Sequence, residues 1–206
     1  MPHTQKGQAT RERLIDAAYE LAIRKGFDRT SIGEILDASG VKKGNFFHHF
    51  SDKESLGLAV LERDRTQMLG MIAAALQESR PLDSIGRFFK LAVQKHTAAG
   101  FVGGCLWGNT ALEMSDSNPA FTTYVAEVFA AWTAKTESVI RAGQKTGEIR
   151  RDIPAAALAR SVIAAVEGGI MQSRLSKKPT EMKSCLAAML RMLPPATPSK
   201  PTRRKP

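Results

Sequence analysis

The segment from Lys42 to His48 carries side chains that can bind nucleic acid. Lysine donates to O6 and N7 of guanine and asparagine can pair with both edge atoms of adenine, so Lys43 and Asn45 suit contacts with base edges. Phe47 lies among them, and His48 suits a phosphate. Taken alone, two adjacent lysines are more typical of a solvated helix start. The interpretation therefore depends on the elements that position this segment.

Three further side chains suit contacts with the phosphate backbone of DNA. Such contacts set the position of a protein on the duplex but carry no sequence information. Thr30 or Ser31, before the segment, and Lys53, after it, could each reach a phosphate. We therefore expect these residues to fix the register of a complex with DNA.

Cys105, Asn109 and Glu113 recur at a spacing of four residues, which places a thiol, an amide and a carboxylate on one helical face. Near a helix N-terminus, Cys105 would lie at the positive end of the helix dipole, which favours the thiolate and its reaction with electrophiles. Glu113 acts in the opposite direction, because a nearby carboxylate raises the pKa of a thiol. The alternative is a buried cysteine that acts as a small hydrophobic residue.

The same residue types give little support to an enzyme or a metal site. Cys105 as a nucleophile with His96 as its base would need an orienting third group, and no local nucleophile motif is present. His48 and His49 are adjacent, which is not the His-x-x-x-His spacing of a helical metal pair, and His3 is distant in sequence. We expect a protein without catalytic activity, metal or cofactor.

The composition, with 43% hydrophobic and 6% aromatic residues, is typical of one or two compact helical domains. Half of the net charge of +10 lies in residues 191–206, so bulk basicity says little about the segment that starts at Lys42. No apolar run approaches the roughly 20 residues of a membrane span, and residues 1–10 lack the apolar region of a signal peptide. Two cysteines, Cys105 and Cys185, do not indicate a disulfide framework. These features predict a soluble cytoplasmic protein without membrane contact.

Helical periodicity recurs along the chain and no window sustains a period of two, which predicts an all-α fold of about nine helices. Capping boxes at Ser31–Glu34 and Ser51–Glu54, and prolines at Pro81, Pro119 and Pro154, mark helix starts. We expect helices at residues 10–25, 31–39, 41–50, 51–78, 81–99, 106–114, 120–145, 153–175 and 180–192.

The second and third of these helices are arranged as a helix-turn-helix. Ser39-Gly40 supplies the turn, and the short helix that follows is led by Lys42 and Lys43. In this motif the second helix lies in the major groove while the first braces it against the backbone. Phe46 and Phe50, one turn apart, would hold the recognition helix against its neighbours.

Residues 9–56 resemble the DNA-binding domain of the TetR family of transcriptional regulators. The resemblance rests on the words Ala17-Ala18, Gly26-Phe27, Thr30-Ser31-Ile32, Ile35, Ser39-Gly40-Val41, Lys43-Gly44, Phe46-Phe47-His48-His49-Phe50 and Ser51-Asp52-Lys53-Glu54-Ser55-Leu56. In that family, the residues that match Thr30, Lys43, Asn45, Phe47, His48 and Lys53 commonly approach DNA. Tyrosine is usual at the position of Phe47, so the phosphate hydrogen bond of a phenolic hydroxyl is lost here and apolar contact remains.

Beyond Leu56 the resemblance is to the number and length of the helices, and it implies a domain that binds a small-molecule effector and forms the dimer. Large apolar side chains on the fourth to seventh helices could line a pocket, although such side chains are more often core. The predicted ligand-binding residues are Met68, Phe88, Phe89, Cys105, Trp107, Asn109, Glu113, Phe121 and Tyr124.

Small residues stand beside branched apolar residues in the helix expected at 153–175, which permits close packing of helices. Similar segments in TetR-like proteins form a four-helix interface between two subunits, and two recognition helices can read a palindrome. Packing within one monomer is the alternative. The predicted interface residues are Val162, Ala165, Val166, Gly169 and Met171.

We therefore expect a DNA-binding domain at residues 1–52, a ligand-binding and dimerisation domain at 53–193, and a disordered basic tail at 194–206, where five prolines occur in thirteen residues. The predicted function is a repressor that binds double-stranded operator DNA as a homodimer. A small molecule or an electrophile would release it by swinging the fourth helix. The alternatives are an architectural DNA-binding protein without a ligand, whose tail adds phosphate contacts, and a helical enzyme that uses Cys105.

Overall fold

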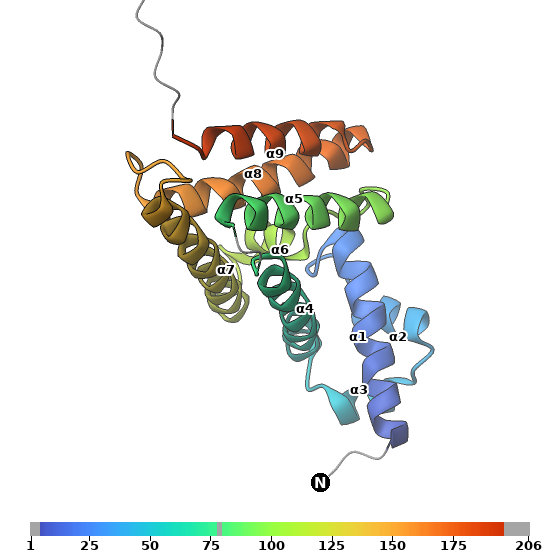
Figure 1. The fold of residues 1–206 in the computed structure, drawn as a ribbon. Helices are drawn as coiled ribbons and strands as arrows, with labels where there is room; N and C mark the ends of the chain where they lie inside the picture. Colours follow the sequence, from blue (N-terminus) through green and yellow to red (C-terminus); the bar gives the residue numbers. More distant parts are fainter. Residues whose placement is uncertain (1–4, 78–79, 196–206) are drawn as a thin grey trace, which may run out of the picture.

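The computed structural model describes residues 5–77 and 80–195, and within these ranges the chain forms nine helices and no strand (Figure 1). The predicted all-α class is confirmed. The helices are α1 (Gln5–Lys25), α2 (Ile32–Ser39), α3 (Lys43–His49), α4 (Lys53–Ala75), α5 (Pro81–Ala98), α6 (Leu106–Met114), α7 (Pro119–Thr146), α8 (Ala155–Ser176) and α9 (Thr180–Met192).

Most helix ends agree with the sequence pattern to within two residues, and two differ by more. Helix α1 begins at Gln5, five residues before the expected start, because residues 5–9 contain no proline that would end the helix. Helix α4 ends at Ala75, before the expected end at Glu78, which lies outside the described residues. Most of the predicted tail, from residue 196 onward, also lies outside them.

The capping box at the start of α2 is confirmed. The hydroxyl of Ser31 accepts from the Glu34 backbone N–H at 3.2 Å, and the Glu34 carboxylate accepts from the Ser31 N–H at 2.9 Å. The box predicted at Ser51 is wrong by one residue. Asp52 is the N-cap of α4, and its carboxylate accepts from the Ser55 N–H at 2.7 Å. An ionised carboxylate binds the free amides at a helix start more strongly than a hydroxyl, which explains the shift.

Figure 1 shows α1, α2 and α3 gathered at one end of the molecule, with α4 leading from them to the remaining helices. Helices α5, α8 and α9 lie across the opposite end, and α7 closes one side. Helix α8 packs against both α7 and α9, and α1 packs against α2, α3, α4 and α6. The small N-terminal group of helices is therefore joined to the rest by α4 and also by a contact between α1 and α6.

Each group of helices has its own buried apolar side chains. Leu14, Ile35 and Phe46 are at most 2% exposed among α1–α3. Ile85 and Val128 are fully buried in the larger group. Truncating a buried phenylalanine to alanine costs about 3–5 kcal/mol, so Phe46 is a principal anchor of α3.

Within residues 5–77 and 80–195, no helix combines the length and the apolar composition that crossing a membrane requires. In the same ranges, no group of three or more His, Cys, Asp and Glu side chains is placed to hold a metal ion.

Candidate functional site

Helix α3 divides sharply between a buried and an exposed side. Val41, Phe46 and Phe50 are buried, and Arg11 of α1 lies 5.2 Å above the ring centroid of Phe50. Gly40, in the left-handed conformation with φ of +62°, makes the turn that brings α3 back against α1 and α2. The arrangement that the sequence predicts for a helix-turn-helix is therefore present.

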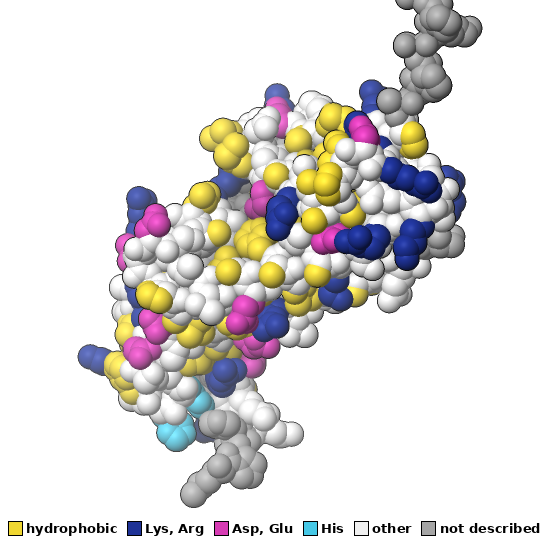
Figure 2. Space-filling view, turned by 90° about the vertical axis from the view of Figure 1, so that its left-hand side faces the viewer, with side chains coloured by type: hydrophobic (Ala, Val, Ile, Leu, Met, Phe, Trp, Pro, Cys, Tyr) yellow, Lys and Arg dark blue, Asp and Glu magenta, His cyan; other side chains and the backbone are white. Residues whose placement is uncertain are grey.

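The other side of α3 faces solvent. The side chains that were predicted to approach DNA are exposed here, and the ring of Phe47 is 49% exposed. They are Lys42, Lys43, Asn45, Phe47 and His48. The space-filling view shows histidine side chains at the end of the molecule where α3 lies (Figure 2). An exposed helix face with two amines, an amide, an imidazole and an aromatic ring can contact both bases and phosphates.

Gly44 lies on this exposed side without a structural reason to be glycine. A Cβ atom built on Gly44 would meet no other atom within 4 Å, and its backbone has an ordinary helical conformation. Glycine inside a helix is less stable than alanine by roughly 0.5–1 kcal/mol. Close approach of a partner to the helix backbone would explain its presence.

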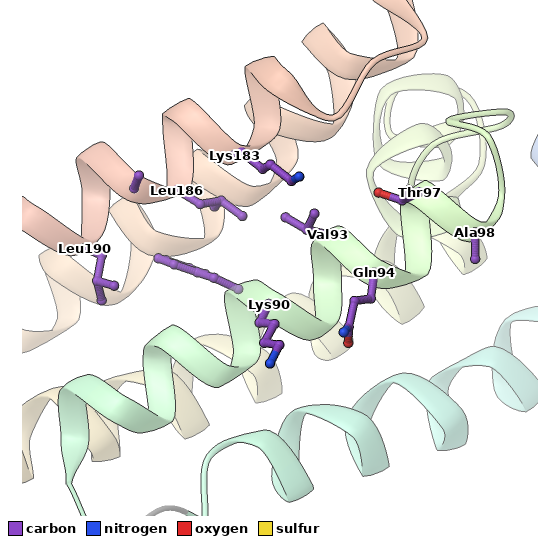
Figure 3. Close-up of a pocket in the computed structure, with 10 residues that line it drawn as sticks. Lys90, Val93, Gln94, Thr97, Ala98, Lys183, Leu186 and Leu190 are labelled. Atoms are coloured by element: carbon purple, nitrogen blue, oxygen red, sulfur yellow. The ribbon is translucent and has the colours of Figure 1, made fainter.

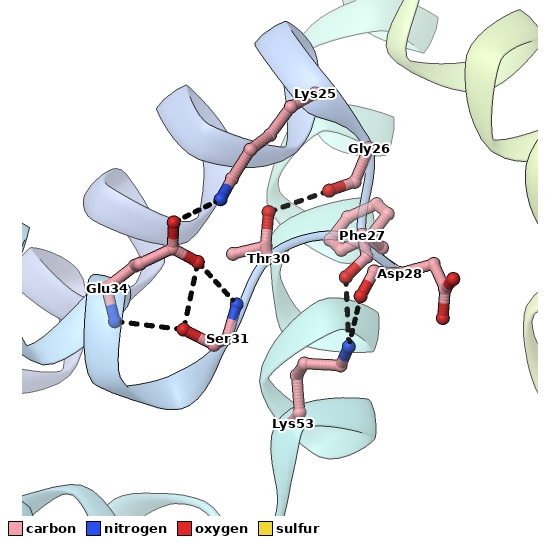
Figure 4. Close-up of polar contacts among 8 residues, drawn as sticks. All are labelled: Lys25, Gly26, Phe27, Asp28, Thr30, Ser31, Glu34 and Lys53. Atoms are coloured by element: carbon pink, nitrogen blue, oxygen red, sulfur yellow. Dashed lines mark hydrogen bonds and ion pairs between the residues drawn. The ribbon is translucent and has the colours of Figure 1, made fainter.

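The two residues predicted to reach a phosphate from the start of α2 make different hydrogen bonds within the chain (Figure 4). Thr30 is 2% exposed, and its hydroxyl donates to the Gly26 carbonyl at 2.7 Å, so it holds the α1–α2 loop together. Ser31 is exposed and caps α2 with Glu34. Hydrogen bonds from Lys25 and Ser31 lower the pKa of Glu34 to about 2.

Lys53, at the start of α4, also reaches the α1–α2 loop. Its ammonium donates to the carbonyl oxygens of Phe27 and Asp28 at 3.0 and 3.1 Å (Figure 4). An ammonium has three donor hydrogens, so one remains for a phosphate. Glu113 of α6 contacts the same loop from the other side, since its carboxylate accepts from the N–H groups of Phe27 and Asp28 at 2.9 and 3.0 Å.

The three polar residues predicted on one face of α6 serve three different contacts. Cys105 is the N-cap residue, and the Asn109 amide donates to the Gly103 carbonyl at 2.6 Å and accepts from Arg174 of α8 at 3.2 Å. Glu113 binds the α1–α2 loop. The spacing was interpreted correctly as one helical face, but the face joins α6 to α1 and α8.

Of the two interpretations of Cys105, the structure favours the cysteine that acts as a small hydrophobic residue over the thiolate. Burial raises the pKa of the Cys105 thiol well above its ordinary value, and the negative charge of Glu167 and a hydrogen bond to it raise it further. The backbone N–H groups of Gly108 and Trp107 lower the pKa, but they do not offset burial. The carboxylate that raises the pKa of this thiol is therefore Glu167 of α8. The sequence pattern predicts Glu113 of α6 in this role. Burial also lowers the pKa of His96, the base of the enzyme alternative, to about 4.

Most of the predicted ligand-binding residues are tightly packed. Buried side chains among them are Met68, Phe88, Phe89, Trp107 and Phe121. The ring of Trp107 stacks on Tyr124, with centroids 6.2 Å apart. The ring of Phe121 lies edge-on to Phe27, with centroids 5.2 Å apart, and so belongs to the contact between α7 and the α1–α2 loop. Whether any of them binds an effector stays a prediction.

Two polar groups in this core were missed. Asp64 of α4 is 6% exposed and accepts from the indole N–H of Trp107 at 2.6 Å. Trp132 of α7 is 3% exposed, and its buried indole N–H has no hydrogen-bond acceptor among the described residues. The ring of Trp132 lies against Phe88 and Phe129, at centroid distances of 5.8 and 5.9 Å. Helical periodicity indicates that Trp132 is buried, but it cannot indicate that its donor lacks a partner.

Most of the residues predicted at a dimer interface are enclosed within the chain. Val162, Val166 and Gly169 are buried, and a Cβ atom at Gly169 would lie 3.2 Å from the Met182 Cα of α9. Ala165 is partly buried beside Cys185, whose thiol donates to its carbonyl at 3.3 Å. Only Met171, at 58% exposure, faces outward. The small residues of α8 therefore serve first to bring α9 close in the same chain.

Comparisons with known proteins agree on one family. Residues 14–60 match the family model of bacterial regulatory proteins of the tetR family, and residues 81–189 match the model of the tetracyclin repressor-like C-terminal domain. The HTH-type transcriptional repressor DhaR of Mycobacterium sp. (strain GP1) is 27% identical over 91% of this chain and 93% of its own length.

Two further proteins give the same result. The transcriptional regulator AcuR of Cereibacter sphaeroides is 31% identical over 83% of this chain and 79% of its own length. A crystal structure of a regulatory protein TetR from Rhodobacter sphaeroides is similar in fold with a TM-score of 0.83. It is 30% identical over 88% of this chain and 97% of that one.

Proposed function

The chain belongs to the TetR family of transcriptional regulators, and we propose that it is a repressor that binds a palindromic operator as a homodimer and is released by a small-molecule effector. The observation that carries the proposal is the exposed face of α3, where Lys43, Asn45 and Phe47 stand on a helix whose other side is buried. The name of the relative DhaR, a repressor, supports repression over activation.

The dimer face that we propose is the outer stripe of α8. Ala164, Gly168, Met171 and Leu175 follow one another at helical spacing on its exposed side, and the apolar side chains of Met171 and Leu175 are 58% and 82% exposed. A Cβ atom at Gly168 would meet nothing within 4 Å. A helix face made of small and apolar residues, which the rest of the chain does not cover, can pack against the same face of a second copy.

The effector contact that we propose is the indole N–H of Trp132. A buried donor without an acceptor costs free energy, about 1–3 kcal/mol, and a ligand with a carbonyl or similar acceptor would recover it. Phe88 and Phe129 lie against the same ring, which suits the apolar part of such a ligand. Met68, Trp107 and Tyr124, on α4, α6 and α7, stay in the proposal as further ligand-binding residues.

Release from DNA would follow from a shift between two arrangements of the helices. The α1–α2 loop is held by Lys53 from α4 and by Glu113 from α6, so a movement of either helix is passed to the helix-turn-helix. The predicted route through α4 is thereby extended by a second route through α6. An effector that binds more tightly to the arrangement with altered spacing of the two α3 helices lowers operator affinity. The size of this loss is set by how much more tightly the effector binds that arrangement than the other.

The protonation state of Cys105 favours a non-covalent effector over an electrophile that reacts with its thiol. The raised pKa keeps the thiol protonated at neutral pH, and the thiolate is the reactive form. We expect slow labelling by N-ethylmaleimide, and we expect the Cys105→Ser variant to respond to effector as the native chain does. Loss of the response in Cys105→Ser would restore the electrophile mechanism.

The operator proposal is tested by selecting DNA sequences from a random pool with the purified chain. The expected product is a palindrome that binds two chains with half-sites about one helical turn apart, and it binds far more tightly than scrambled DNA at the same salt concentration. Equal affinity for both DNAs, with a steep salt dependence, would favour the architectural alternative.

The effector proposal is tested by screening small carbonyl compounds for release of this operator. Trp132→Phe removes the N–H and keeps an aromatic ring. We expect this variant to bind operator normally and to lose most of the response to the effector. A full response in Trp132→Phe would place the effector elsewhere.

A further inference from the structure

An apolar groove lies on the surface between α5 and α9, and of the predicted ligand-binding residues Phe89 lines it (Figure 3). It has a volume of about 660 Å³, which is in the range of small-molecule sites. Phe89 and Val93 of α5 and Leu186 and Leu190 of α9 form its apolar walls. None of the residues that line it is acidic.

The two ends of the groove differ in chemistry. At one end α9 lies near Gly86, where a Cβ atom would be 3.7 Å from a Leu190 methyl carbon. The opposite end is polar, because Lys183 of α9 and Thr97 of α5 line it there. Figure 3 shows Lys183 extending toward the α5 side of the groove near Val93, whereas the amine of Lys90 points away from α9.

Lys183 has no ion-pair partner within residues 5–77 and 80–195, although its charge stands beside an apolar surface. We propose that this groove binds an amphiphilic monocarboxylate, with the carboxylate at Lys183 and Thr97 and the apolar chain along Val93 and Leu186 toward Leu190. The part of α5 from Phe89 to Ala98 spans about 13 Å at 1.5 Å per residue, which suits a medium-length aliphatic chain.

Charge argues against the other occupants. The C-terminal residues 196–206 carry four Lys/Arg and no acidic residue, so they would place like charges beside Lys183. A second copy of the chain would bring its own Lys90 and Lys183 to the same place. Cys185, which contacts Ala165 of α8, lies on a different face of α9 from Lys183 and Ala187. A dimer formed through the outer stripe of α8 leaves the groove open.

Decanoate, below its micelle concentration, is the probe, and decyltrimethylammonium and decanol are its cationic and neutral counterparts. We expect calorimetry to show one decanoate per chain and weaker binding of both counterparts. The methyl resonances of Leu186 and Leu190 should shift on titration. The proposal would be overturned if decyltrimethylammonium bound as tightly as decanoate. It would also be overturned if decanoate shifted only methyl resonances of residues on α6 and α8.

Two variants test the two halves of the site. Lys183→Gln should weaken decanoate binding about three- to tenfold, since it removes one charged hydrogen bond at a partly exposed place, while Lys135→Gln on α7 should not. Ala187→Trp fills the groove from an exposed position and should abolish binding, while Ala134→Trp on α7 should not. Unchanged binding in both Lys183→Gln and Ala187→Trp would show that the ligand binds elsewhere. Self-association that Ala187→Trp removes would assign the groove to a second copy instead.

Discussion

Lys53 and Glu113 bind the backbone of the same two residues, Lys53 as hydrogen-bond donor and Glu113 as acceptor. The ammonium donates to the carbonyls of Phe27 and Asp28, and the carboxylate accepts from their N–H groups. One side chain comes from α4 and the other from α6, 60 residues further along the chain. The loop between α1 and α2 is therefore part of both groups of helices.

Removing the Glu113 carboxylate leaves two loop N–H groups without their acceptor. We expect Glu113→Ala to lower the free energy of unfolding by about 1–3 kcal/mol and to weaken operator binding, since the loop precedes the helix-turn-helix. Urea denaturation and fluorescence anisotropy measure the two effects. Glu137→Ala, which breaks an exposed pair with Arg141 on α7, is the control and should cost at most about 0.5 kcal/mol. Equal losses in the two variants would contradict the role of Glu113.

The assignments on α3 and at the start of α4 predict two kinds of loss. Lys43→Ala and Asn45→Ala should each weaken operator binding by about 1–3 kcal/mol and leave random DNA less affected, because they remove base contacts. Lys53→Ala should weaken all DNA sequences alike and reduce the salt slope by about one unit, because it removes one phosphate contact. Titrations of operator and random DNA at several salt concentrations separate these results. If Lys43→Ala and Asn45→Ala weakened both DNAs equally, the base-contact assignment would be lost.

Gly44→Ala should change stability and DNA binding in opposite directions. The added methyl group meets no atom of the chain, so the free energy of unfolding should rise by about 0.5–1 kcal/mol. Operator affinity should fall, because in the proposed complex the methyl group would stand where DNA approaches the helix backbone. Gly70→Ala on α4 is the matched control, since its Cβ also meets nothing within 4 Å. It should gain similar stability without loss of affinity, and a Gly44→Ala variant that binds normally would rule out close approach.

Gly168→Arg should separate the dimer without unfolding the chain. The new side chain has free space in one chain but would place a charge in the proposed interface. Sedimentation velocity should show monomers, and operator affinity should fall strongly. Gly169→Arg is a poor substitute, because its side chain would enter the contact with Met182 and destabilise the fold. A Gly168→Arg chain that remains a tight dimer would move the interface elsewhere.

His96 makes stability depend on pH. Burial first, and the charge of Lys95 second, lower its pKa in the folded chain from 6.5 to about 4. The unfolded chain therefore takes up a proton at higher pH than the folded chain does, and stability falls as the pH decreases from 6.5 to about 4. The loss due to His96 is on the order of 3 kcal/mol. Urea denaturation across this range should show a flatter pH dependence in His96→Gln, and identical slopes would refute the assignment.

Helix periodicity and caps predict most of the fold, because both depend on residues close together in sequence. The box at Ser31 is an example, and even the displaced N-cap at Asp52 is an error of one residue. Periodicity also identifies Val166 and Gly169 as one packed face of α8. It cannot tell whether the partner helix belongs to the same chain, and here Met182 of α9 occupies that face.

The candidate site could be predicted where function requires exposure, and less well where it requires tertiary contacts. Lys43 and Asn45 lie on the solvent side of α3, as expected from the motif. Thr30 carries a hydroxyl that could bind a phosphate, but this hydroxyl donates to the Gly26 carbonyl. The effect of Glu167 on Cys105 depends on α8 meeting α6, a contact between residues 62 positions apart that no local pattern encodes.

The two tryptophans of the chain have contrasting surroundings, since the Trp107 indole is bonded to Asp64 and the Trp132 indole lacks an acceptor. Indole emission responds to hydrogen bonding and to the polarity around the ring. With Trp107 replaced by phenylalanine, the remaining fluorescence would come from a single indole in the core of the larger group of helices. The molecule thus carries an intrinsic optical probe at the effector site that we propose.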